Sequence, residues 1–169
     1  MPATLLPSSG DQPAASGPPV KTCDASGMAE IHRMFRAGFG EGRMLVEAVP
    51  EGDAAQADLV GDHLDMLSVG LHAHHEGEDT MLWAPLEQRA PSCTAHVERM
   101  KQQHAAMLVH LTAMDESLPA WRASGRSADA EDVLAALDGI NAALAAHLPD
   151  EESNIVPVME TVIKIGRAS

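Results

Sequence analysis

Aromatic residues, cysteines and basic residues are all scarce in this sequence, and each scarcity narrows what the protein can be. Only 2% of the 169 residues are aromatic, and tyrosine is absent. A core must therefore be built from Leu, Val, Ala and Met, which favours helices over sheets. The absence of tyrosine also excludes tyrosyl-radical chemistry and phenolate ligation of a metal.

Acidic residues outnumber basic residues by 25 to 11, which gives a formal net charge of −14. This balance argues against nucleic acid and anionic membranes as partners, because both bind to basic patches. The two cysteines, Cys23 and Cys93, form neither a CxxC pair nor a disulfide framework, and they are typical of reduced cytosolic thiols. No apolar run approaches the roughly 18 residues of a transmembrane helix, so we expect a cytoplasmic protein.

The composition divides the chain into a short tail and one domain. Five of the 11 prolines fall in the first 19 residues, mixed with Ser, Gly and Ala, so we predict a disordered tail over residues 1–25. From Met28 onward the apolar pattern is helical, and we assign residues 26–169 to one domain. The pattern breaks at Pro50, between Pro85 and Pro91, and between Ser124 and Ser127. The four segments predict an all-α, up-down-up-down four-helix bundle.

Each segment carries one stripe of residues spaced alternately three and four apart, as packed helices require. The stripes are Met28, His32, Phe35, Phe39, Gly42, Val46 and Val49; Val60, Leu64, Leu67, Leu71, His74, Glu78 and Met81; Val97, Met100, His104, Met107, Leu111, Met114 and Leu118; and Val133, Leu137, Ile140, Leu144, His147 and Glu151. Apart from Gly42, each stripe is apolar until it reaches one histidine, and in two stripes a glutamate follows one turn later. The first helix allows a second stripe through Ile31 and Met34, which would turn His32 away from the core.

The stretch LHAHHEGED contains three overlapping pairs of a histidine and an acid, each with a spacing of four. Only His74 and Glu78 lie on the apolar stripe. His72 is rotated by about 200° from His74 around a helix, and His75 lies about 100° to one side. The pattern therefore buries His74 with Glu78 and places the other pairs on an exposed or flanking surface. Whether His72 or His75 adds a ligand stays open.

Four imidazoles and two carboxylates in one bundle core must pair with one another or bind cations. A metal-free network is tolerable only if every member is satisfied, so six such groups favour a metal site. Imidazole suits Fe, Zn, Cu and Ni, and carboxylate can bridge two ions. No cysteine lies on a stripe, which excludes a zinc–thiolate site. Two ions, with iron favoured, bridged by Glu78 and Glu151 account for all six ligands. The Glu-x-x-His spacing of ferritin-like di-iron bundles is absent.

The order of these residues resembles the hemerythrin-like, or HHE cation-binding, proteins, whose mark is His, His-x-x-x-Glu, His and His-x-x-x-Glu on successive helices. The matching segments are IHRMF at 31–35, HHEGED at 74–79, QQH at 102–104 and HLPDEE at 147–152. The resemblance covers residues 28 to about 165. It implies a non-haem di-iron centre with an oxo, hydroxo or carboxylate bridge, reactive toward O₂, peroxide or NO. Carried over by position, the metal ligands are His32, His74, Glu78, His104, His147 and Glu151.

Two departures from the family's pattern bear on function. Oxygen-carrying hemerythrins have a fifth histidine one turn from the third-helix ligand, where this chain has Met100 and Leu108, which argues against O₂ carriage of that type. The carriers also place the last acid five residues after the final histidine, at Glu152 here, whereas periodicity favours Glu151. Pro149 precedes both acids and leaves the local register open.

Fewer histidine ligands leave an iron with open or water-filled positions, which favours reactivity toward small molecules. We therefore expect a redox protein acting on peroxide or O₂. The alternative is a non-catalytic module that senses or stores O₂, NO or iron, and a third possibility is a metal-free or zinc-bound structural bundle. The sequence does not separate the first two, so whether the protein is an enzyme stays open.

Overall fold

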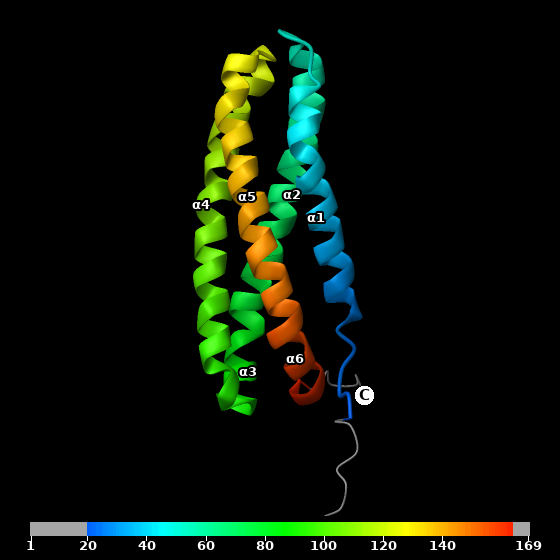
Figure 1. The fold of residues 1–169 in the computed structure, drawn as a ribbon, viewed down its shortest axis with the longest axis vertical. Coiled ribbons are helices and arrows are strands. Elements are labelled where there is room, and N and C mark those ends of the chain that lie inside the picture. The colour runs from blue at the N-terminus through cyan, green and yellow to red at the C-terminus, as the bar shows by residue number, and fades with distance from the viewer. Residues whose placement is uncertain (1–19, 164–169) are drawn as a thin grey trace, which may run out of the picture.

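The computed structural model describes residues 20–163, which form one elongated bundle of helices (Figure 1). The long helices are α1 (Ser26–Glu47), α2 (Ala54–Met81), α4 (Thr94–Ser124) and α5 (Ser127–Asn154). The short elements are α3 (Trp83–Arg89), the 3-10 helix η1 (Pro91–Cys93) and α6 (Val156–Val162). No strand occurs between residues 20 and 163, and the predicted all-α bundle is confirmed.

The long helices run alternately up and down, as predicted (Figure 1). Helices α1 and α4 each pack against both α2 and α5. This topology brings the beginnings of α1 and α4 to the same end of the bundle as the ends of α2 and α5, where α3 and α6 also lie. The four helix segments that carry the stripe histidines therefore meet at one end.

The turns at the opposite end depend on two residues that suit helix ends. Asp53 caps α2, because its carboxylate accepts a hydrogen bond from the backbone N–H of Gln56 at 3.0 Å. Gly125 ends α4 in the left-handed conformation, with φ of 61°. A Cβ atom at Gly125 would lie only 2.5 Å from the backbone of Asp53, so this junction needs glycine.

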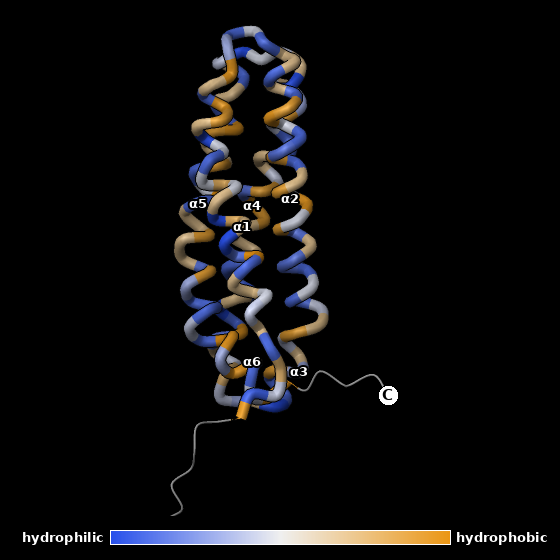
Figure 2. The backbone as a smooth tube through the Cα atoms, turned by 90° about the vertical axis from the view of Figure 1, so that its right-hand side faces the viewer, coloured by the Kyte–Doolittle hydropathy of each residue, from blue (hydrophilic) through white to orange (hydrophobic). Residues whose placement is uncertain are grey.

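The predicted stripes form the apolar core. Figure 2 shows hydrophobic and hydrophilic residues alternating along each long helix. One large apolar cluster runs through most of the bundle and includes Phe35, Leu71, Met107 and Leu144. A smaller cluster at the α3 and α6 end consists of Trp83, Leu86, Val97, Met100 and Ile155. Along each long helix, the stripe histidine directly follows or precedes the residues of the large cluster. The polar residues therefore lie between the two apolar clusters.

The structure decides between the two possible stripes of the first helix and corrects one residue of the second stripe. His32 is fully buried, whereas Met34 is 50% exposed, so the alternative stripe in the first helix is wrong. Met81, which was predicted to lie on the second stripe, is 74% exposed. It is the last residue of α2, and Trp83 fills the apolar cluster at this level in its place.

Residues 1–19 of the predicted disordered tail lie outside the described residues. The rest of that predicted tail contacts α6 and the residue that follows it. The Thr22 backbone N–H donates to the Glu160 carbonyl at 2.6 Å, its hydroxyl donates to the Ile163 carbonyl at 2.8 Å, and Lys21 pairs with the Glu160 carboxylate at 2.7 Å. Lys21 and Thr22 therefore lie against the end of the bundle that α6 covers. None of the described helices combines the length and the hydropathy that crossing a membrane would take.

Candidate metal centre

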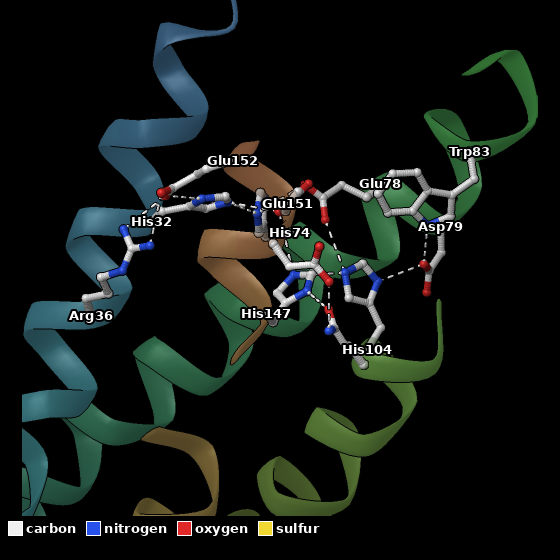
Figure 3. A network of polar contacts seen from close by, with 12 residues as sticks. His32, Arg36, His74, Glu78, Asp79, Trp83, His104, His147, Glu151 and Glu152 are labelled. Atoms are coloured by element: carbon white, nitrogen blue, oxygen red, sulfur yellow. Dashed lines mark hydrogen bonds and ion pairs between the residues drawn. The ribbon is translucent and has the colours of Figure 1, made fainter. Parts of the chain in front are cut away.

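The histidines and glutamates of the stripes converge between the long helices, as Figure 3 shows. α1 contributes His32, α2 contributes His74 and Glu78, α4 contributes His104, and α5 contributes His147 and Glu151. None of these six side chains is more than 9% exposed. All six predicted site residues are therefore buried in one place.

The buried side chains form two groups of potential ligand atoms that share Glu78. The first group consists of His32, His74, Glu78 and Glu151, and the second of His75, Glu78, His104 and His147. Within each group the ligand atoms all lie within 4.8 Å of one another. Donor atoms about 2.0–2.2 Å from a common ion have separations of this order. Two neighbouring ions could thus share the Glu78 carboxylate.

Hydrogen bonds hold three of the histidine rings from their outer sides (Figure 3). His32 Nδ1 lies 2.9 Å from Glu152 Oε1, His104 Nδ1 lies 2.8 Å from Asp79 Oδ1, and His147 Nδ1 lies 2.9 Å from Gln103 Oε1. Because each partner atom is an acceptor, each Nδ1 carries a hydrogen and donates it. In the neutral tautomer that such a hydrogen bond selects, Nε2 presents a lone pair toward the centre, as in metal-binding histidines.

The Nε2 atoms that face the centre lie close to one another. His104 Nε2 and His147 Nε2 are 3.2 Å apart, and the same distance separates His32 Nε2 from His74 Nε2. In the first of these pairs both Nδ1 atoms are already donors, so two lone pairs face each other with no hydrogen between them. A bound cation removes this conflict, and the geometry therefore fits a metal ion better than a metal-free network.

The two buried glutamates support the same conclusion. None of the four carboxylate oxygens of Glu78 and Glu151 has a hydrogen-bond partner within residues 20–163. Imidazole nitrogens approach them, with His74 Nε2 3.2 Å from Glu78 and His32 Nε2 3.3 Å from Glu151, but the orientations make no hydrogen bond. An uncompensated buried carboxylate is strongly unfavourable, and cations would compensate both.

Burial controls the protonation of the histidines. It lowers the pKa of His74 and of His147 to about 4, and it lowers the pKa of His75 still further. These imidazoles are neutral near pH 7, which is the form that binds metal ions. For His32, burial also favours the neutral form, but the carboxylates of Glu151 and Glu152 outweigh it and raise the pKa.

The two glutamates differ in their charge state without metal. Burial, followed by the charge of Glu151, raises the pKa of Glu78. Burial also acts on Glu151, but contact with His32 and the charge of His147 outweigh it and lower that pKa. The metal-free centre thus keeps Glu151 ionised and Glu78 protonated near neutral pH.

Without metal, the free energy of unfolding should be greatest near pH 6.5. His74 and His147 have folded-state pKa values of about 4, against 6.5 when exposed. Their contribution to the free energy of unfolding is therefore lost as the pH falls from 6.5 toward 4. Glu78 and His32 have raised pKa values, so their contributions are lost as the pH rises. His75, whose pKa is lowered further, adds to this loss, so urea unfolding of chelator-treated protein should show that the free energy of unfolding falls on the order of 4 kcal/mol between pH 6.5 and 5. A steady rise in stability from pH 5 to 8 would contradict this assignment.

Glu152, the alternative acid of the fourth helix, lies outside the centre. It is 31% exposed, accepts from His32, and is held by two hydrogen bonds from the Arg36 guanidinium at 3.0 and 3.1 Å. α5 continues through Pro149 to Asn154, so the helical register persists and Glu151 faces the core. The structure thus places Glu151 among the potential ligands and Glu152 behind His32.

His75 lies on the flank of the stripe, as predicted, but the expectation that this flank is exposed is wrong for His75. It is only 5% exposed, and its ring stacks on that of His104 with centroids 4.0 Å apart. α2 packs against α4 as well as α1, and this packing covers the side of the stripe on which His75 lies. The expected width of a buried stripe, at least about 100°, could have indicated this position.

A cavity of about 270 Å³ opens between α2 and α4 beside the second group of ligand atoms. The buried rings of His75 and His104 form part of its wall, together with the more exposed side chains of His72, Lys101 and Leu108. The cavity therefore reaches two rings of the second group from the surface, while His75 Nε2 and the Glu78 oxygens are buried behind its wall.

Comparison with known proteins gives one match. A model of the family described as hemerythrin HHE cation binding domain matches residues 24–159, which include every residue of both ligand groups. No curated protein and no solved structure gave a significant match.

Proposed function

Since this chain belongs to the hemerythrin HHE cation-binding domain family, we propose that its two ligand groups hold two iron ions. His32, His74 and Glu151 would hold one ion, His104 and His147 the other, and Glu78 both. Glu151, expected from the sequence to form a second bridge, would thus bind one ion alone. Mixed imidazole and carboxylate donors suit iron. The opposed Nε2 lone pairs and the carboxylates without partners support this proposal from the geometry alone.

The proposed activity is a redox reaction with peroxide or O₂. The observation that carries it is the cavity of about 270 Å³, whose wall includes the rings of His75 and His104 and which would give small molecules a path toward the second ligand group. A structural metal would need no such path. When bound, iron supplies one-electron redox chemistry between Fe(II) and Fe(III). The protein's own residues fix the ligand rings through their outer hydrogen bonds and exclude large molecules from the centre.

Peroxide consumption tests this function. Iron-loaded protein in a large excess of hydrogen peroxide should consume many equivalents of peroxide per chain. The loss of peroxide absorbance and the release of O₂ both measure this consumption. The same protein loaded with zinc, which has no redox chemistry, is the matched control. A single oxidation of the bound iron followed by inertness would instead indicate a sensing or storage module.

Narrowing the cavity should slow the reaction without changing metal binding. Leu108 lines the cavity and is 43% exposed, so Leu108→Trp is expected to lower the rate of peroxide consumption about ten-fold by obstructing the path. Val109→Trp is the matched control, because Val109 is 66% exposed and does not line this cavity. Equal rates in the two variants would exclude this path.

Glu151 and Glu152 should respond differently to removal of their charge. Glu152→Gln is expected to keep two ions and to weaken their binding by about 10–100-fold, since Glu152 acts through His32. Glu151→Gln is expected to lose at least one ion. Chelator competition measures both effects, and the reverse order would identify Glu152 as the ligand.

A further inference from the structure

His75 is the one histidine of the centre that the His, His-x-x-x-Glu, His, His-x-x-x-Glu pattern does not account for. That pattern uses His74 with Glu78 in the second helix. Nevertheless, His75 is more deeply buried than the exposed His72 on the same helix, and its Nε2 atom has no hydrogen-bond partner within the described part of the chain. A buried, unpartnered polar nitrogen calls for an explanation.

The neighbours of His75 are all potential metal ligands. A ligand atom of its ring lies within 4.8 Å of ligand atoms of Glu78, His104 and His147. Its ring is parallel to that of His104, with an interplanar angle of 12°, and edge-on to that of His147, with centroids 5.0 Å apart. None of these contacts is a hydrogen bond, so packing alone leaves the Nε2 atom unsatisfied.

The two ligand groups are unequal in composition. The first contains two imidazoles and two carboxylates, and the second contains three imidazoles and one carboxylate when His75 is included. Without His75, the second group would have only three ligands, one of them shared. At Met100 and Leu108 on α4 the chain has no imidazole, and His75 reaches the same cavity wall as Leu108 from the neighbouring helix.

We propose that His75 is a seventh metal ligand, which binds the second ion through Nε2 together with His104, His147 and Glu78. The inference rests on the proposed function, because it requires two bound ions. It makes the second ion, the one beside the cavity, the richer in imidazole ligands. If His75 instead only lines the cavity and binds no metal, metal binding should not depend on it.

The unmodified protein gives a test that no folding defect can obscure. Zinc-loaded protein labelled with ¹⁵N-histidine should show five of its nine imidazoles with the nitrogen shift of a metal-bound atom. These would be His32, His74, His75, His104 and His147. Four ligated imidazoles, with His75 free, would overturn the inference and leave the two-ion proposal standing.

Cobalt(II) titration of variants provides the second test. His75→Ala and the bulkier His75→Gln should each weaken binding of one ion by more than the 10–100-fold typical of an outer hydrogen-bond partner, and leave the other ion bound. His72→Ala, an exposed position on the same cavity, should bind both ions as the unmodified protein does. Unchanged binding in both His75 variants would overturn the inference. Failure of the unmodified protein to bind two ions would instead refute the proposed function itself.

Discussion

Glu78→Gln is expected to remove tight binding of both ions and, at the same time, to stabilise the metal-free protein. Glu78 is the only residue shared by the two ligand groups, so its loss should weaken the binding of both ions. We expect each affinity to fall by more than about 100-fold, which exceeds the effect of losing a residue that only hydrogen-bonds a ligand. Its carboxylate is 6% exposed and neither oxygen has a hydrogen-bond partner in the described chain. Replacing an uncompensated acid by a neutral amide should therefore raise the unfolding free energy by about 1–3 kcal/mol.

Urea unfolding of chelator-treated proteins at pH 8 measures this gain, because the Glu78 carboxyl is under the greatest pressure to ionise at high pH. Glu76→Gln, at an exposed position on the same helix and in neither ligand group, removes one charge and should change stability little. A Glu78→Gln protein that is less stable than the unmodified protein, with metal absent from both, would show that Glu78 is satisfied within the protein. The argument for a cation would then lose its main support.

Metal loading is expected to stabilise the fold by about 5 kcal/mol. Each site at a free-ion concentration 100 times its dissociation constant adds about 2.7 kcal/mol, and the groups carry two sites. For a domain of this size, the melting temperature should rise on the order of 10–20 °C. The gain arises because the ions compensate buried groups contributed by all four long helices, so unfolding any helix disrupts the centre.

Calorimetry of the same preparation before and after chelation measures the shift. The Glu78→Gln protein is the internal control, because it should melt at nearly the same temperature with and without added metal. A difference of less than 2–3 °C between loaded and chelated unmodified protein, with ions shown to be bound, would place them at surface sites.

The sequence was sufficient to predict the fold and to bring six polar residues of the stripes together at one end of the bundle, while their role as metal ligands stays a prediction. The apolar stripes correctly predicted that His32, His74, His104 and His147 face the core, because a four-helix bundle has one core and each helix turns one face toward it. The breaks at Pro50, at Pro85 and at Ser124 also coincide with helix ends or with the short elements between helices.

The residues that the sequence did not predict are those whose role depends on neighbouring helices. His75 lies beside the stripe of α2, and the packing of α2 against α4 decides which flank of that stripe is buried. Gln103 and Asp79 bind the Nδ1 atoms of histidines on other helices, which no periodicity within one helix can show. Glu152 is placed by Arg36 of α1 in the same way.

The most direct test of a di-iron centre is the iron content and optical spectrum of protein expressed with added iron and purified in air. We predict two irons per chain and near-ultraviolet absorption from oxo-to-iron charge transfer, both lost in the Glu78→Gln variant. Zinc, or no metal and a featureless spectrum, would contradict the redox function. The buried histidines and glutamates would then belong to a structural bundle.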